Sequence, residues 1–259
     1  MRLMYRLPGW WGAEDPYWIG DCLHGMSAIP DKSVDLIVTD PPYGITKEIA
    51  DGLNTRFISE CFRILKDGRH IFCFVGQKTL PAFFIEFERC GFTWQNTIVW
   101  KYDNALPRET KRFCISYDPI LHFSKREPSI FNIIRVPYKS TERLKYPVNN
   151  AKKKGWRPHP DGAKMKDIWE IPAVTSPSYS KEKVEGMAEM GWQKPLKLIE
   201  IPILSCSNEG EVVFDPFLGS GTLLEACQNT NRIGIGFEIK PEYETIIQGR
   251  LRKESRIDV

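Results

Sequence analysis

The stretch S-V-D-L-I-V-T-D-P-P-Y, residues 33–43, joins an apolar run of strand length to a stiff turn. Turn-forming residues bound the apolar run, which is typical of a buried strand. Pro41 and Pro42 donate no backbone hydrogen bond, and Pro41 restricts Asp40 to extended conformations. A carboxylate, carbonyl groups and the Tyr43 ring therefore stand rigidly at the carboxyl end of a strand. Such a set can accept hydrogen bonds from an amino group and stack on a planar base; a strand-ending turn with a surface acid is the alternative.

Apolar runs and amphipathic runs alternate along most of the chain. Short apolar runs predict strands, at 17–22, 34–39, 70–75, 97–100, 114–123, 211–215 and 232–238. Apolar residues at helical spacing predict helices, at 23–29, 47–65, 80–90, 194–199, 223–227 and 242–251. This alternation predicts an α/β fold whose sheet carries helices on both faces.

The composition is that of an ordinary globular protein, with 42% hydrophobic and 27% charged residues in a chain of 259. That length suits one domain with an insertion, and no apolar run approaches a membrane span. The first eight residues lack the apolar core of a secretory signal, so we expect a cytoplasmic protein. The seven cysteines are odd in number and form no C-x-x-C pair. They predict reduced, mostly buried thiols that form neither disulfides nor metal sites.

Residues 124–189 break the pattern, because prolines, lysines and turn-forming residues replace the periodic runs. The segment is too long for a plain loop, so we expect an inserted functional segment. Its part from 125 to 160 holds ten basic residues and two acidic ones, with aromatic residues between them. Such a block is typical of a surface that binds a polyanion, and a solvated loop is the alternative. The basic residues are Lys125, Arg126, Arg135, Lys139, Arg143, Lys145, Lys152, Lys153, Lys154 and Arg157.

A second group of residues, D-P-F-L-G-S-G-T at 215–222, lies between a predicted strand and a predicted helix. Gly219 and Gly221 let the backbone turn tightly and approach a ligand closely, and the helix start offers free N–H groups. Glu238 ends the next strand about 20 residues later, where an acid binds ribose hydroxyls in nucleotide-binding sheets. The arrangement predicts a cofactor that contains a nucleoside; a surface acid before the turn at 240–241 is the alternative.

The order of these motifs resembles that of the S-adenosylmethionine-dependent amino-methyltransferases of DNA, in the permuted arrangement called the β class. D-P-P-Y (40–43) comes first, the irregular basic segment follows, and F-L-G-S-G-T (217–222) lies near the end. Three shorter stretches also resemble motifs of that family, G-D-C at 20–22, D-I-W-E-I-P at 167–172 and Q-K-P-L at 193–196. Many relatives carry a histidine at the position of Met190, so a local loop contact differs in this chain.

The resemblance implies a Rossmann-like methyltransferase sheet of seven strands, mostly parallel with one antiparallel, and helices on both faces. The catalytic half of that domain would be 1–123, which carries D-P-P-Y, and the cofactor-binding half would be 190–259. Residues 124–189 would form an inserted target-recognition region. The implied partner is double-stranded DNA, in a bacterial, archaeal or phage-encoded protein that is either a monomer or a homodimer.

The resemblance also implies a role for each residue that matches a family motif. The catalytic residues would be Asp40, Pro41, Pro42 and Tyr43. S-adenosylmethionine, whose product is S-adenosylhomocysteine, would be held by Asp21, Cys22, Asp40, Lys194, Asp215, Phe217, Gly219, Ser220, Gly221, Thr222 and Glu238. No metal ion is expected.

The chemistry of an exocyclic amino group explains why these residue types suit the reaction. The amino group is a poor nucleophile because its lone pair is delocalised into the ring. If Asp40 and the Pro41 carbonyl accept its two hydrogens, the nitrogen can pyramidalise toward the sulfonium methyl group. The base must leave the duplex to reach the site, and Tyr43 is the expected stacking partner. In this family an Asp at position 40 favours adenine N6, whereas relatives that act on cytosine N4 more often have Ser.

Other functions compatible with parts of the sequence remain as alternatives. Methylation of cytosine N4 is one, and methylation of RNA or of single-stranded DNA is another. A DNA-binding relative without activity would have no need of intact motifs at 40–43 and 217–222. A nicotinamide dehydrogenase fits less well, because the chain has no complete G-x-G-x-x-G and the motif at 40–43 would have no role.

Overall fold

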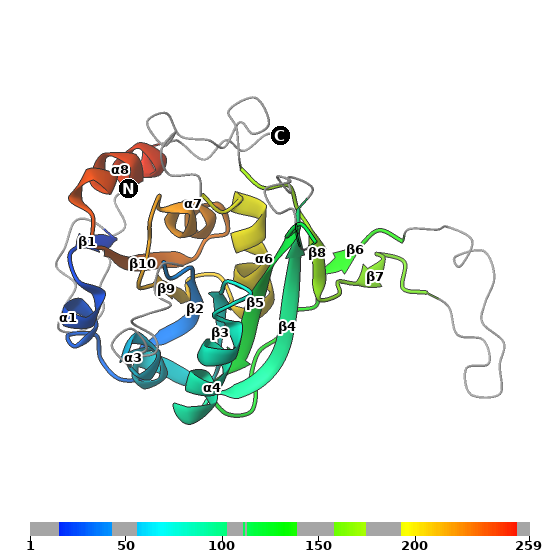
Figure 1. The fold of residues 1–259 in the computed structure, drawn as a ribbon, viewed down its shortest axis with the longest axis horizontal. Helices are drawn as coiled ribbons and strands as arrows, with labels where there is room; N and C mark the ends of the chain where they lie inside the picture. Colours follow the sequence, from blue (N-terminus) through cyan, green and yellow to red (C-terminus); the bar gives the residue numbers. More distant parts are fainter. Residues whose placement is uncertain are drawn as a thin grey trace.

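The computed structural model describes residues 16–42, 56–102, 111, 113–138, 158–174 and 193–252. Within them, an eight-stranded sheet forms the centre of the protein, in the order β1-β10-β9-β2-β3-β5-β4-β8 (Figure 1). Its strands are β1 (Tyr17–Ile19), β2 (Val34–Thr39), β3 (Leu65–Phe74), β4 (Thr93–Lys101), β5 (Tyr117–Ser124), β8 (Ile168–Glu170), β9 (Val212–Asp215) and β10 (Ile233–Glu238).

One strand of this sheet, β5, runs against its neighbours. It pairs antiparallel with β3 and with β4, whereas every other pairing in the described sheet is parallel. The expected mostly parallel methyltransferase sheet with a single antiparallel strand is therefore confirmed. The eighth strand is β8, which comes from the irregular segment 124–189 and adds to the edge by pairing Trp169 with Trp100 of β4.

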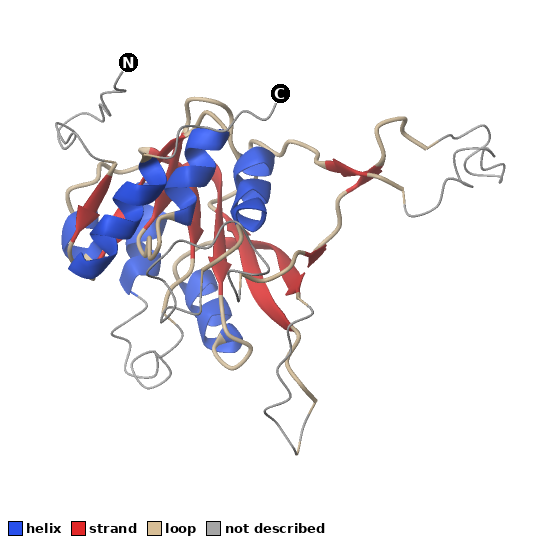
Figure 2. Cartoon of the chain, turned by 90° about the horizontal axis from the view of Figure 1, so that it is seen from above, coloured by secondary structure: helices blue, strands red, loops and turns tan. Residues whose placement is uncertain are grey.

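The central strand β2 shows how both faces of the sheet are covered. Alternate side chains of a strand point to opposite faces, so Leu36 and Val38 enter one core cluster and Ile37 enters the other. The first face is covered by α6 (Leu196–Cys206), α7 (Thr222–Asn229) and α8 (Glu244–Leu251). The second is covered by α1 (Cys22–Met26), α3 (Arg56–Ile64) and α4 (Leu80–Arg89). Figure 2 shows helices packed beside the strands.

A buried acid near the amino end of β2 fixes that strand between its two neighbours. The Asp35 side chain is 3% exposed. Its Oδ1 lies 2.7 Å from Lys66 Nζ of β3, and its Oδ2 accepts a 3.0 Å hydrogen bond from the Val212 N–H of β9. Because a buried charge needs such partners, β2 is held in one register, and the residues that follow it are placed accordingly.

Several predicted boundaries were wrong, and the two largest differences have a physical reason. The helix expected at 47–65 ends at Ile64, and Leu65 begins β3, so the strand expected at 70–75 starts five residues earlier. Gly68 has φ 77°, and the β2–β3 register is irregular at this end, so the strand continues past the glycine as a bulge. The helix expected at 194–199 continues to Cys206 as α6, because its apolar residues pack into the core despite Pro202 within it.

The irregular segment contributes little regular structure among its described residues. β6 (Arg135–Val136) and β7 (Ala163–Lys164) form a separate antiparallel ribbon that extends away from the main sheet (Figure 1). Of the residues between these two strands, 139–157 lie outside the described part of the chain. In the described residues, no helix has the length and apolar character that a membrane span requires.

Candidate active site

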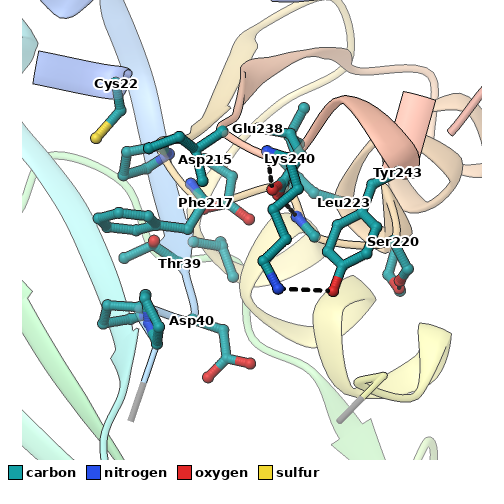
Figure 3. A pocket seen from close by; sticks show the side chains of 18 of the residues that line it. Cys22, Thr39, Asp40, Asp215, Phe217, Ser220, Leu223, Glu238, Lys240 and Tyr243 are labelled. Atoms are coloured by element: carbon teal, nitrogen blue, oxygen red, sulfur yellow. Dashed lines mark hydrogen bonds between the residues drawn. The ribbon is translucent and has the colours of Figure 1, made fainter. Parts of the chain in front are cut away.

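A cavity of about 800 Å³ opens at the carboxyl ends of β1, β2, β9 and β10. Open α/β sheets bind ligands at this edge, in the loops that follow the strands. Side chains from separate strands face the cavity, as Figure 3 shows for the acids at the ends of β2, β9 and β10. It brings together most of the predicted residues, Asp21, Cys22, Asp40, Pro41, Pro42, Lys194, Asp215, Phe217, Gly219, Ser220, Thr222 and Glu238. The predicted stacking residue, Tyr43, lies outside the described residues.

The glycine-containing loop between β9 and α7 depends on left-handed backbone conformations. Gly219 has φ 53° and Gly221 has φ 76°, which L side chains rarely adopt. A side chain at Gly221 would also meet Ile247 of α8 at 3.2 Å. Gly219 lines the cavity, whereas Gly221 supports the turn from behind. The hydroxyls of Ser220 and Thr222 lie 3.1 Å apart where α7 begins.

The carboxylate of Glu238, at the end of β10, holds the same loop in place. Its Oε2 accepts a 2.7 Å hydrogen bond from the Gly219 N–H, and its Oε1 accepts a 2.9 Å bond from the Lys240 N–H. Burial raises the pKa of this carboxyl above its ordinary value, and the two backbone donors oppose that shift. Glu238 is thus a fixed acceptor in the cavity wall, with lone pairs left for a ligand.

Asp215, at the end of β9, is buried, as Glu238 is. Burial raises the pKa of its carboxyl to about 7, opposed by the hydrogen bond that its Oδ1 accepts from the Phe217 N–H at 2.9 Å. The nearby Asp40 and Glu238 carboxyls also raise it. Three acids therefore share one cavity, which favours a ligand that carries positive charge.

Asp40, at the end of β2, forms an ion pair with the lysine that precedes α6. Lys194 Nζ lies 2.5 Å from Asp40 Oδ2 and faces the rings of Phe74 and Trp100, 5.4 Å and 5.8 Å from their centroids. Among the described residues, no group donates a hydrogen bond to the buried Oδ1 of Asp40. One oxygen of the carboxylate is therefore fixed by the lysine, and the other is left as an acceptor.

Two polar residues outside the cavity, Asp118 and Tyr102, lie close to this ion pair, and the sequence analysis did not predict them. Burial raises the pKa of the Asp118 carboxyl of β5, opposed by the Lys194 ammonium and by a hydrogen bond from the Tyr102 hydroxyl. Burial beside Asp118 in turn raises the pKa of Tyr102 to about 12. Lys194 therefore lies in the field of two carboxylates, Asp40 and Asp118, on different strands.

The loop after β1 lines the cavity beside Glu238, whose carbonyl accepts a 2.8 Å hydrogen bond from the Gly20 N–H. The Asp21 side chain caps α1, since its Oδ1 accepts a 2.8 Å hydrogen bond from the Leu23 N–H. Burial, with the neighbouring Asp21 charge, raises the pKa of the Cys22 thiol to about 12. Cys22 thus contributes a neutral, packed wall, and the cap fixes the direction in which α1 leaves the cavity.

Sequence analysis missed several residues that line the cavity, among them Phe57, Lys240 and Tyr243. Phe57 of α3 packs edge-on against Phe217, with ring centroids 5.0 Å apart. Lys240 and Tyr243, in and beside the short helix η2 (Pro241–Tyr243), lie against each other, with Nζ 3.3 Å from the hydroxyl (Figure 3). The sequence signal that could have found Lys240 and Tyr243 is their position shortly after Glu238.

The three described basic residues that were predicted to bind DNA do not line this cavity. Because β5 is antiparallel, its last residue pairs with His70 and Thr93, toward the amino ends of β3 and β4. Lys125 follows it, is 4% exposed, and donates to the carbonyls of Phe62 and Leu65 at 2.5 and 2.7 Å. A DNA contact by Lys125 is therefore a wrong prediction, since this lysine caps the end of α3.

The remaining predicted basic residues are divided between described and undescribed positions. Arg126 is exposed on the same edge as Lys125, with Nη1 3.5 Å from Asp67 Oδ2. Arg135 of β6 donates a 2.9 Å hydrogen bond to the Gly162 carbonyl and so supports the projecting ribbon. The others lie outside the described residues: Lys139, Arg143, Lys145, Lys152, Lys153, Lys154 and Arg157.

Comparison with known proteins shows which family the chain belongs to. The model of the family N6_N4_Mtase, described as DNA methylase, matches residues 34–249. The chain belongs to the DNA methylase family. The methylase is 32% identical over 249 residues to the type II methyltransferase M.HpaI of Haemophilus parainfluenzae, covering 90% of this chain and 73% of that protein. It is 31% identical over 238 residues to the DNA adenine methyltransferase YhdJ of Escherichia coli K12, covering 86% and 78%.

Solved structures share the fold of the methylase. The cytosine-N4-specific PvuII DNA methyltransferase superposes with a TM-score of 0.69 at 20% identity, covering 93% of this chain and 87% of that one. The M1.HpyAVI–SAM complex superposes with a TM-score of 0.61 at 24% identity, covering 91% and 98%. The names of these similar proteins therefore differ in target base, which is adenine for YhdJ and cytosine, at N4, for the PvuII enzyme.

Proposed function

We propose that this methylase transfers the methyl group of S-adenosylmethionine to the exocyclic N6 amino group of adenine in double-stranded DNA. The observation that carries the proposal is the Asp40 carboxylate, with one oxygen bound to Lys194 and the other a buried acceptor at the cavity. It stands beside the Pro41 carbonyl at the cavity that also holds Glu238 and the glycine loop. The adenine methyltransferase among the relatives supports the choice of base.

The residues around the cavity fit S-adenosylmethionine in charge and in size. A cavity of about 800 Å³ lies in the range of small-molecule sites. The acids Asp40, Asp215 and Glu238 suit a ligand with a sulfonium and an ammonium group, and Glu238 retains acceptor capacity for ribose hydroxyls. Phe217 and Leu218 offer apolar surface to an adenine ring. When bound, this cofactor supplies the electrophilic methyl group, and the SAM complex among the structural neighbours supports the assignment.

The role of the chain's own residues is to raise the nucleophilicity of the amino nitrogen. Asp40 Oδ1 and the Pro41 carbonyl accept its two N–H bonds, which turns the lone pair out of conjugation with the ring. Lys194 compensates the charge of Asp40 and fixes the orientation of the carboxylate. The proton lost from the methylated nitrogen passes to Asp40 or to water, so positioning supplies most of the acceleration.

The target base has to enter this cavity from the duplex. Its amino group is paired inside the helix, so the base must be flipped out to reach Asp40. Tyr43 as the stacking partner and 124–189 as the recognition region stay predictions, because Tyr43 and most of the basic residues lie outside the described part. In this proposal 1–123 and 190–259 form one catalytic domain.

Cytosine N4 is the second candidate target. The structural neighbour with the higher TM-score is named as cytosine-N4-specific, and the same acceptor pair would serve either amino group. The residue Asp40, and not a serine, favours adenine within this family. A binding protein without activity is a third candidate, and the intact acceptor at Asp40 disfavours it.

The decisive experiment is methylation of an unmodified plasmid with purified protein and S-adenosylmethionine, followed by modification-sensitive sequencing and nucleoside analysis. The expected product is N6-methyladenine at one sequence context. N4-methylcytosine would replace the adenine proposal with the second candidate. A folded protein that binds the cofactor but leaves the plasmid unmethylated would support the inactive binding protein.

A further inference from the structure

A group of potential metal ligands lies in the core, away from the cofactor cavity. It consists of His70 of β3, His122 of β5 and Cys206 at the end of α6, and all three are buried. One ligand atom from each lies within 4.8 Å of the other two. The three residues are 52 and 84 positions apart along the chain, so the fold brings them together.

The hydrogen bonds of His70 show which of its two ring nitrogens faces the other potential ligands. His70 Nε2 lies 2.8 Å from the Ile130 carbonyl, which can only accept, so Nε2 carries the proton. In a neutral ring Nδ1 then has a free lone pair, and it lies 3.0 Å from His122 Nε2. Metal-binding histidines are oriented in this way, with the other ring N–H donated to a carbonyl group.

The spacing of the two rings is close to that of a tetrahedral site. Zinc–nitrogen bonds of 2.0–2.1 Å place two ligand nitrogens about 3.3 Å apart, against 3.0 Å between these rings. A small outward movement therefore makes room for an ion between His70, His122 and the Cys206 sulfur. Two imidazoles and one thiolate form a ligand set that zinc prefers over calcium or magnesium.

A second cavity, of about 500 Å³, gives access to this group. It lies between the sheet, α6 and the irregular segment, and His122 and Ser205 are among the residues that line it. Ser205 Oγ lies 3.6 Å from the Cys206 sulfur. An ion can thus enter from this side, and a water molecule in the cavity can serve as the fourth ligand.

We propose that His70, His122 and Cys206 form a binding site for one zinc ion or a similar thiol-binding divalent ion. Binding takes the lone pairs of His70 Nδ1, His122 Nε2 and the Cys206 thiolate. The thiol releases its proton to solvent, and the ring proton of His122 moves from Nε2 to Nδ1, so one proton leaves for each ion bound. The ion ties β3, β5 and α6 together, which is a structural role separate from methyl transfer.

Cobalt titration tests this site directly, because tetrahedral Co²⁺ absorbs in the visible range and a thiolate ligand adds a near-ultraviolet charge-transfer band. The protein should carry a Cys114→Ser substitution, since Cys114 is the exposed thiol among the described cysteines. We expect saturation at one equivalent of Co²⁺, displacement of both bands by Zn²⁺, and a higher unfolding temperature with Zn²⁺ present.

Two variants separate this site from other thiols. Cys206→Ser should remove the charge-transfer band and weaken Co²⁺ binding at least tenfold, and His122→Asn should weaken it similarly. Cys227→Ser, which removes a buried cysteine outside the group, should leave the titration unchanged. Should a variant fail to fold, the titration of the protein with all three ligands intact still decides the question. Absence of a one-equivalent cobalt signal, or a charge-transfer band that persists in Cys206→Ser, would overturn the proposal and leave a hydrogen-bonded histidine pair.

Discussion

Replacing Asp40 by Asn tests the proposed mechanism most directly, because it keeps the shape of the side chain and removes its charge. The proposed acceptor acts in a buried site, where removing one positioned group typically reduces the rate about 10²–10³-fold, or about 2.7–4 kcal/mol in activation free energy. We expect Asp40→Asn and Asp40→Ala to fall in or beyond that range. Cofactor affinity should change much less, since Glu238 and the glycine loop lie on other strands.

The same substitution also affects stability, and the structure indicates by how much. Lys194 is 7% exposed and Asp40 is 23% exposed, so the substitution removes one partner of a largely buried ion pair. The Asp118 carboxylate remains near the ammonium, which limits the loss. We expect the free energy of unfolding to fall by about 1–3 kcal/mol, as for a buried group that loses its partner.

A double-mutant cycle separates these two effects. Lys194→Met removes the ammonium, so adding it to Asp40→Asn should restore most of the lost stability. Methyl transfer should stay at the level of Asp40→Asn alone. The assay is a single turnover with tritium-labelled S-adenosylmethionine on unmodified DNA, alongside urea unfolding of all four proteins. Transfer within tenfold of the unsubstituted protein in Asp40→Asn would refute the catalytic role, and so would rescue of activity by Lys194→Met.

Three further predictions concern other parts of the molecule. Glu238→Ala should weaken cofactor binding at least tenfold in calorimetry, with the exposed Glu242→Ala as control; equal affinities would remove Glu238 from the site. Neutralising Lys152, Lys153 and Lys154 together should make DNA binding less sensitive to salt. The slope of log affinity against log salt should fall in magnitude by about 0.9 for each phosphate contact that is lost. The control Lys125→Met should lower stability and leave this slope unchanged. The pKa of Asp215 is raised to about 7, so the native state retains a proton that the unfolded chain releases above about pH 4. Stability should therefore decline as pH rises through that window, and urea unfolding should show a smaller decline in Asp215→Asn, because the raised pKa values of Glu238 and Asp118 act in the same direction.

The sequence was informative where local chemistry determines structure. The apolar run before Asp40 and the glycines at 219 and 221 each fix a short piece of backbone, and both were placed correctly at strand ends. Their meeting in one cavity followed from a general property of open sheets, that ligands bind at the carboxyl ends of strands. The expectation of a single antiparallel strand came from the resemblance to a known family, because no local sequence pattern indicates it.

The sequence was uninformative where a side chain acts through residues far away in the chain. Lys125 looks like one of ten surface cations, and only the reversal of β5 brings it against the end of α3. Lys194 was predicted to hold the cofactor, and its ion pair with Asp40 crosses 154 positions. Cys206 forms no sequence motif with His70 and His122, because these two spatial neighbours come from separate strands.

The reversal of β5 has a consequence for how this enzyme family can vary. It directs the chain out of the sheet at the edge away from the cavity, and β8 brings it back beside the carboxyl end of β4. The intervening segment is attached to the sheet through β5 and β8. Each doubling of its length should therefore cost only about 0.6 kcal/mol in loop-closure entropy. A new segment can therefore be exchanged without disturbing the carboxylates at the cavity. Under the proposed function, the strand reversal therefore lets the segment that would choose the DNA sequence change separately from the residues that act on the base.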